Sequence, residues 1–144
     1  MLIEVPIPQN RRIDMAQGAN ILVVDDEQVI LDLFSRVLGT RGHKITIAKD
    51  GYQAIEEVKK GKFDIIFLDI IMPGINGLET YKKIKEVDPD AHTIMMTGYS
   101  VAELVEQALL EGVQDCLHKP FDIMEIMKTV EKVLEIKKLE GDKK

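Results

Sequence analysis

Hydrophobic and polar positions change their spacing repeatedly along this chain. Two short runs are apolar throughout, residues 21–24 (ILVV) and residues 65–68 (IIFL), as is typical of strands that are buried on both faces of a sheet. Short segments rich in Ile, Thr and Met predict further strands at residues 44–48 and 93–96, and residues 115–118 (DCLH) give a weaker signal of a short strand. Between the strands, apolar residues recur every three or four positions, which predicts amphipathic helices at residues 27–40, 51–60, 78–87, 100–111 and 121–139.

The predicted elements form five units in which a strand is followed by a helix. Such alternation is typical of an α/β fold with a parallel central sheet and right-handed crossovers. We place the folded domain at residues 20–139. Residues 1–19, which contain two prolines and lack a clear hydrophobic period, are interpreted as an N-terminal extension, and residues 140–144 as a flexible C-terminal tail.

The composition narrows the classes of protein that fit. The 144 residues include a single cysteine, which excludes a disulfide framework and a multi-cysteine metal site. The formal net charge of -6 argues against nucleic-acid binding. No apolar run approaches about 18 residues, so we expect no membrane-spanning helix, and the first residues lack the pattern of a secretory signal. We therefore expect a cytoplasmic protein that binds neither nucleic acid nor membrane.

Polar residues follow the predicted strands at their carboxyl ends. Asp25 and Asp26 follow the first strand, Asp69 the third, Thr97 the fourth and Lys119 the fifth. The carboxyl ends of parallel strands meet at one edge of a sheet, and ligands of such sheets bind there. We therefore expect three carboxylates, a hydroxyl and an ammonium group to form one site.

The expected group of three carboxylates needs a cation. Neighbouring carboxylates repel one another, so their pKa values should be coupled and partly raised. Oxygen ligands suit Mg²⁺, which takes one or two carboxylates together with water and phosphate oxygens. An ammonium group and a hydroxyl would neutralise charge on a phosphoryl group, while one carboxylate could serve as a nucleophile. The residue types therefore indicate phosphoryl chemistry with Mg²⁺ as the cofactor.

Several ordered motifs resemble the receiver domain of two-component response regulators, over about residues 20–134. They are ILVVDDE, DGYQAIE, DIIFLDIIMPGINGLE, MMTGYS and LHKPF. The segment around Asp69 is the most specific of these, and the ordered combination is a stronger signal than any single motif. The resemblance implies a flavodoxin-like doubly wound (βα)5 sandwich, with a five-stranded parallel sheet in the strand order 2-1-3-4-5.

The resemblance also implies a role for each acidic residue of the expected site. Asp69 would be the phosphoacceptor. Mg²⁺ would be bound by Asp25, Asp26 and Asp69 and by the main-chain carbonyl of Ile71.

Residues after the fourth and fifth strands would handle the phosphoryl group itself. By the resemblance, Thr97 and Lys119 would each bind a phosphoryl oxygen, and Gly98 would leave room for the group. Pro120 would follow a cis peptide bond, an isomer found at only about 5–6% of X–Pro bonds in folded proteins.

By the same resemblance, the chain would be a signalling domain and not a turnover enzyme. Its partner would be a sensor histidine kinase or a phosphotransfer protein, whose phosphohistidine donates to Asp69. Phosphorylation would shift a two-state equilibrium at the face formed by the fourth helix, the fifth strand and the fifth helix, which could also form a homodimer. Mg²⁺-dependent self-dephosphorylation would reset the domain. The readout would pass to a downstream effector or to an output domain, to which the long last helix would suit a linker.

One position departs from the family pattern. Receivers usually have Phe or Tyr three residues before the lysine, and this ring swings inward on activation, but here the position is Cys116. A small thiol cannot report the position of Thr97 as an aromatic ring does. Either the output face switches differently, or a nearby ring such as Tyr99 compensates.

Two other functions start from the same residues. Phosphatases of the haloacid dehalogenase type also use a strand-end aspartate, but they resemble Asp-x-Asp, and the residue two positions after Asp69 is Ile71, which carries no proton for turnover. A receiver-like interaction scaffold that is never phosphorylated is the other alternative. The intact acidic residues, together with Thr97 and Lys119, count against it.

Overall fold

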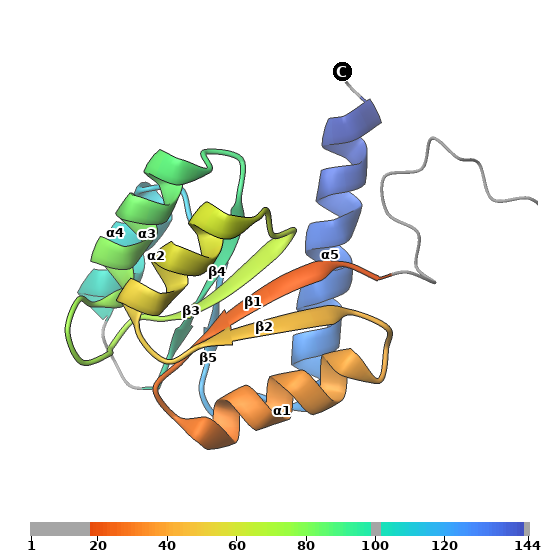
Figure 1. The fold of residues 1–144 in the computed structure, drawn as a ribbon, viewed down its shortest axis with the longest axis horizontal. Helices are drawn as coiled ribbons and strands as arrows, with labels where there is room; N and C mark the ends of the chain where they lie inside the picture. Colours follow the sequence, from red (N-terminus) through yellow and green to blue (C-terminus); the bar gives the residue numbers. More distant parts are fainter. Residues whose placement is uncertain (1–17, 99–101, 143–144) are drawn as a thin grey trace, which may run out of the picture.

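A computed structural model describes residues 18–98 and 102–142 of the chain (Figure 1). Its five strands are β1 (Asn20–Val24), β2 (Lys44–Ala48), β3 (Ile65–Asp69), β4 (His92–Thr97) and β5 (Asp115–His118). They pair in parallel as one sheet in the order β2-β1-β3-β4-β5. The predicted α/β fold and the predicted strand order are confirmed.

The five helices cover the two faces of this sheet. They are α1 (Gln28–Gly39), α2 (Gly51–Lys60), α3 (Gly77–Val87), α4 (Ala102–Leu110) and α5 (Ile123–Asp142). α1 and α5 pack on one face, and α2, α3 and α4 pack on the other (Figure 1). Within the described ranges, no helix is long and apolar enough to span a bilayer.

The sheet separates two apolar cores because successive strand residues point to opposite faces. On β1, Ile21 and Val23 pack into the same core as Phe34 of α1. Leu22 and Val24 of the same strand pack into the other core, with α2 and α3. All five side chains are fully buried. The continuous apolar run of the sequence is thus explained by a strand that is covered on both sides.

The ends of the folded region differ slightly from the prediction. α5 was expected to end at residue 139 but continues to Asp142. Glu140 Oε1 lies 2.9 Å from His92 Nε2, and this contact fastens the last turns of the helix to the start of β4. At the other end, Ala19 is buried, and its N–H donates to His43 Nδ1 at 3.0 Å, so the core begins before residue 20.

The start of α3 is held against the end of β3. Asn76 caps the helix in a reciprocal capping box with Glu79, and the Gly77 N–H donates to the Ile70 carbonyl at 2.7 Å. A Cβ on Gly77 would collide with the main-chain carbonyl of Asp69. Only glycine therefore lets α3 approach so closely, and this approach fixes the backbone that carries Asp69.

Candidate functional site

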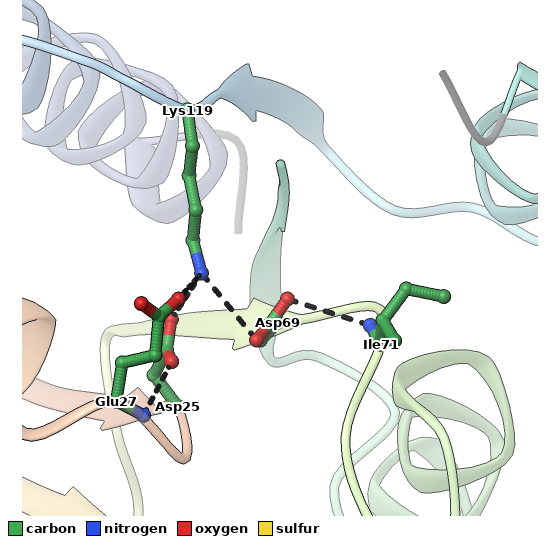
Figure 2. A network of polar contacts seen from close by, with 5 residues as sticks. All are labelled: Asp25, Glu27, Asp69, Ile71 and Lys119. Atoms are coloured by element: carbon green, nitrogen blue, oxygen red, sulfur yellow. Dashed lines mark hydrogen bonds and ion pairs between the residues drawn. The ribbon is translucent and has the colours of Figure 1, made fainter. Parts of the chain in front are cut away.

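Three strands bring charged side chains together at their carboxyl ends (Figure 2). Asp25 follows β1, Asp69 is the last residue of β3, and Lys119 follows β5. Asp25 and Asp69 are both buried, at 0% and 4% exposure. The predicted meeting of strand ends is confirmed for these three residues, although they lie far apart in the sequence.

Lys119 lies at the centre of the group. Its Nζ is 2.8 Å from Asp25 Oδ2, 3.0 Å from Glu27 Oε1 and 3.4 Å from Asp69 Oδ2. Its main-chain N–H donates to the carbonyl of Thr97 at 2.6 Å, which joins β5 to β4 beside the site. The bond between Lys119 and Pro120 is cis, as predicted.

Glu27 is a member of the site that the sequence did not reveal. It comes directly after the acidic pair, and its main-chain N–H donates to Asp25 Oδ1 at 2.9 Å. Its carboxylate contacts an ammonium group 92 positions away in the chain. The only available signal was a third acidic residue in the segment ILVVDDE, which equally suits the first turn of a helix.

The two buried carboxylates differ in how their oxygens are satisfied. Asp69 Oδ1 accepts a hydrogen bond from the Ile71 N–H at 3.4 Å. Asp25 Oδ2 pairs with the Lys119 ammonium group at 2.8 Å, and Asp25 Oδ1 accepts a hydrogen bond from the Glu27 N–H at 2.9 Å. The two buried carboxylates thus share one ammonium group, and a buried charge that is incompletely paired favours the binding of a further cation.

Burial changes the proton affinity of the site. Removal from water and the neighbouring Asp25 charge raise the pKa of Asp69 from 3.8 to about 7, against the opposing effect of Lys119. Burial also raises the pKa of Asp25, and Lys119 offsets part of this rise. Burial alone would lower the pKa of Lys119, but its contacts with Asp25, Asp69 and Glu27 outweigh burial and raise it. Lys119 therefore stays charged, while Asp69 is poised to lose or gain a proton near neutrality.

The acidic residues of the site fit a hard divalent cation. Asp25, Asp26 and Asp69 can each offer one carboxylate oxygen such that these atoms all lie within 4.8 Å of one another. Asp26 is exposed, whereas the other two are buried, so the cluster is open to solvent on one side. The sharing of one ammonium group by two buried carboxylates adds to this fit, and all-oxygen sites with open positions suit Mg²⁺.

The remaining predicted residues lie around this cluster. Thr97 is buried at the end of β4, and a Cβ on Gly98 would lie 3.8 Å from Lys119 Cδ, so Gly98 borders the lysine stem. Ile71 contributes its N–H to Asp69, and its own side chain is 54% exposed.

Cys116 lies on β5. It is partly buried and packs against the core beneath α2, α3 and α4, together with Leu104 and Val105. Burial and the nearby Asp115 raise the pKa of the Cys116 thiol to about 11. The thiol therefore stays protonated near neutral pH and acts as a small packing group. Tyr99, which we considered as a compensating ring, lies outside the described residues.

Fold and site together define a receiver-type α/β domain, with an acidic cluster and a lysine at the carboxyl ends of a doubly wound sheet. The family model of the response regulator receiver domain matches residues 21–131. The chain therefore belongs to the family of response regulator receiver domains.

Named relatives agree with this family. The chain is 35% identical over 117 residues to sporulation initiation phosphotransferase F of Bacillus subtilis, covering 81% of this chain and 94% of that protein. It is 36% identical over 115 residues to the transcriptional regulatory protein ZraR of Escherichia coli, covering 80% of this chain but only 26% of ZraR. The crystal structure of a CheY-like receiver domain protein from Methanospirillum hungatei superposes with a TM-score of 0.80 at 26% identity, covering 88% of this chain and 98% of that one.

Proposed function

We propose that this domain accepts a phosphoryl group on Asp69 from the phosphohistidine of a sensor histidine kinase or a phosphotransfer protein, in the cytoplasm. The observation that carries the proposal is the position of the Lys119 ammonium, 3.4 Å from Asp69 Oδ2. A carboxylate that attacks phosphorus needs a fixed cation beside the oxygens on which charge develops. A buried carboxylate of raised pKa beside a partly buried ammonium group is typical of functional sites.

The chain's own residues divide the work of the transfer. An oxygen of the Asp69 carboxylate forms a bond to phosphorus, and the bond between phosphorus and the imidazole nitrogen of the donor breaks, with the electron pair leaving on the imidazole. Lys119 and the Thr97 hydroxyl bind phosphoryl oxygens, and Gly98 leaves space for them. The buried β3 end holds Asp69 in place, so no ordering is needed at the moment of transfer.

Magnesium would be held beside Asp69 by the acidic cluster. Its ligands would be Asp25, Asp26, Asp69 and the main-chain carbonyl of Ile71. The ion would neutralise charge on the phosphoryl oxygens.

Phosphorylation would then be read at the surface made by α4, β5 and α5. Both helices of this surface carry exposed apolar side chains, Leu109 and Leu110 at the end of α4 and Ile123 and Met124 at the start of α5. The readout would be a downstream effector, an output domain or a homodimer through this surface. ZraR, of which the chain spans about a quarter, is named a transcriptional regulatory protein, so an output domain has precedent among relatives.

The proposed domain is a signalling module and not a turnover enzyme. An aspartyl phosphatase would need an acid or base two residues after the nucleophile, and Ile71 occupies that position. Self-dephosphorylation would release each phosphoryl group slowly and reset the switch.

The decisive experiment is incubation of the chain with acetyl phosphate and Mg²⁺, followed by intact mass measurement and peptide mapping. We expect a mass increase of one phosphoryl group, located on Asp69, that requires Mg²⁺ and is absent from Asp69→Asn. Asp32→Asn, which alters an exposed carboxylate of α1, is the matched control and should be modified like the parent. A chain that stays unmodified with this donor and with a phosphorylated histidine kinase would contradict the proposal and favour a scaffold.

A further inference from the structure

Glu27 occupies the N-cap position of α1 but does not cap the helix. Its backbone is extended, and within the described part of the chain its side chain makes no capping hydrogen bond. Ser, Thr, Asp and Asn are the side chains that cap well. α2 and α3 of the same domain follow this rule, since Asp50 and Asn76 accept hydrogen bonds from the first turns of their helices. The start of α1 therefore forgoes a local stabilisation, which is a common sign of a residue that serves a site.

The Glu27 carboxylate points instead into the acidic site (Figure 2). It lies 3.0 Å from Lys119 Nζ, closer than Asp69, which lies at 3.4 Å. Its side chain is 56% exposed, whereas the side chains of Asp25 and Asp69 are 0% and 5% exposed. Glu27 is thus the partner of Lys119 that lies at the mouth of the site.

Lys119 must change partners when a phosphoryl group enters. Three carboxylates already surround its ammonium group, and phosphoryl oxygens on Asp69 would have to join or replace them. Asp25 is buried and cannot recover solvation, so giving up its cation would leave an unpaired charge away from water. Glu27 can turn toward water at little cost because it is already half exposed.

From this we propose that Glu27 is a positioning residue that holds Lys119 before phosphorylation and competes with the phosphoryl oxygens for it. The inference rests on the proposed function of Asp69. Release of Lys119 by Glu27 is then part of the cost of phosphoryl entry. Glu27 sets how readily the domain is phosphorylated and how firmly it retains the group, although it does not touch either reacting atom.

Two substitutions at one position separate the contact with Lys119 from the charge of Glu27. Glu27→Asp keeps the charge but is one methylene shorter, and aspartate at an N-cap turns back to its own helix. Glu27→Gln keeps the length but removes the ion pair. Asp32→Asn removes a charge from the exposed side of the same helix and is the matched control.

At saturating Mg²⁺, we expect both Glu27 variants to be phosphorylated by acetyl phosphate about two- to fivefold faster than the parent, the range that corresponds to a half-exposed ion pair. Asp32→Asn should keep the parent rate. Equal or slower rates for both variants would overturn the proposal. A faster Glu27→Gln beside a Glu27→Asp at the parent rate would also overturn it, because the charge and not the hold on Lys119 would then be responsible.

A second measurement needs no phosphorylation. In the metal-free protein, the NMR signals of the Lys119 side chain should shift in both Glu27 variants and stay in place in Asp32→Asn. Unmoved Lys119 signals would overturn the inference directly. If the NMR signals of Lys119 shift and the parent is phosphorylated, but the Glu27 variants are phosphorylated at the parent rate, the inference fails and the proposed function stands. If the parent is never phosphorylated, the proposed function fails and the inference falls with it.

Discussion

At the scale of single residues, the Asp69 carboxylate is the main group through which the site destabilises the folded state. The folded chain buries this group beside a second buried carboxylate, Asp25, and offers it one N–H and a shared ammonium group. A buried charge with incomplete pairing destabilises the folded state. The domain thus maintains a buried carboxylate of raised pKa at the expense of its own stability.

We expect Asp69→Asn to stabilise the metal-free protein. The substitution removes the repulsion with Asp25, and Lys119 keeps Asp25 and Glu27 as partners, so no buried charge is left alone. The free energy of unfolding at pH 8 should rise by roughly 1–3 kcal/mol, given about 1.4 kcal/mol per unit of a raised carboxyl pKa. Urea denaturation in the presence of a chelator measures this change. Asp32→Asn should stay near the parent, and a loss of stability in Asp69→Asn would refute the repulsion argument.

The same group predicts how stability depends on pH. A pKa of about 7 in the folded state, above the ordinary 3.8, means that the folded protein retains a proton that the unfolded chain has already lost. The free energy of unfolding without metal should therefore decrease as the pH rises from about 4 to about 7, and then level off. Asp25, whose pKa is also raised by burial, acts in the same direction.

Denaturation curves at several pH values in that window test this dependence. Asp69→Asn should have a flatter profile than the parent, because it lacks the main titrating group. Saturating Mg²⁺ should remove the decrease, since a cation favours the ionised carboxylates. A metal-free stability that rises with pH across the window would contradict the burial of these charges.

At the scale of the elements, Gly77 links the start of α3 to the end of β3. A Cβ at this position would collide with main-chain atoms of Asp69 and Ile70. Because these atoms belong to the backbone, rotation of a side chain cannot relieve the collision. We expect Gly77→Ala to destabilise the domain by about 1–3 kcal/mol and to slow phosphorylation, because relief of the collision displaces the backbone of Asp69. Chemical denaturation and the labelling rate are the measurements.

Gly39 gives the matched control for this substitution. It is the last residue of α1, and a Cβ there would meet no atom within 4 Å. Gly39→Ala should be neutral or stabilise by up to about 1 kcal/mol, with the parent labelling rate. Equal effects of the two substitutions would show that helix propensity, and not the approach to Asp69, determines the role of Gly77.

The elements also show what a sequence can and cannot predict here. Continuous apolar runs predict β1 and β3, and Asp25 and Asp69 directly follow these runs in the sequence. Their meeting in one site could be predicted because the carboxyl ends of parallel strands lie at the same edge of the sheet. The contact of Glu27 with Lys119 was not predicted, since side-chain reach across 92 positions follows from the final packing. The end of α5 at Asp142 was missed for a similar reason, because the contact between His92 and Glu140 is tertiary.

At the scale of the whole molecule, folding and assembly of the site are one event. The carboxylates and the ammonium group come from β1, β3 and β5, and Asp69 and Lys119 are 50 positions apart. The unfolded chain, with a formal net charge of -6, holds these groups far from one another. A cation that needs several of them at once therefore binds the folded chain and not the unfolded one.

Magnesium should accordingly raise the melting temperature of the parent in a concentration-dependent manner. A ligand that binds only the folded state adds RT ln(1 + [L]/Kd), which is about 2.7 kcal/mol at a concentration of 100 Kd. The relief of the repulsion between Asp25 and Asp69 contributes to the affinity for the ion, so the stabilisation should be larger at pH 8 than at pH 5, where protons compete for the same oxygens. Thermal melts with millimolar MgCl₂ at the two pH values measure this stabilisation and its pH dependence, with NaCl at equal ionic strength as the control for screening.

Asp25→Asn should lose most of the Mg²⁺-dependent shift in melting temperature, because it replaces a buried carboxylate of the cluster, whereas Asp32→Asn should keep the shift. A melting temperature that responds equally to both salts would mean that the acidic cluster binds no ion, and Asp69 would then lack the cation that its proposed chemistry requires.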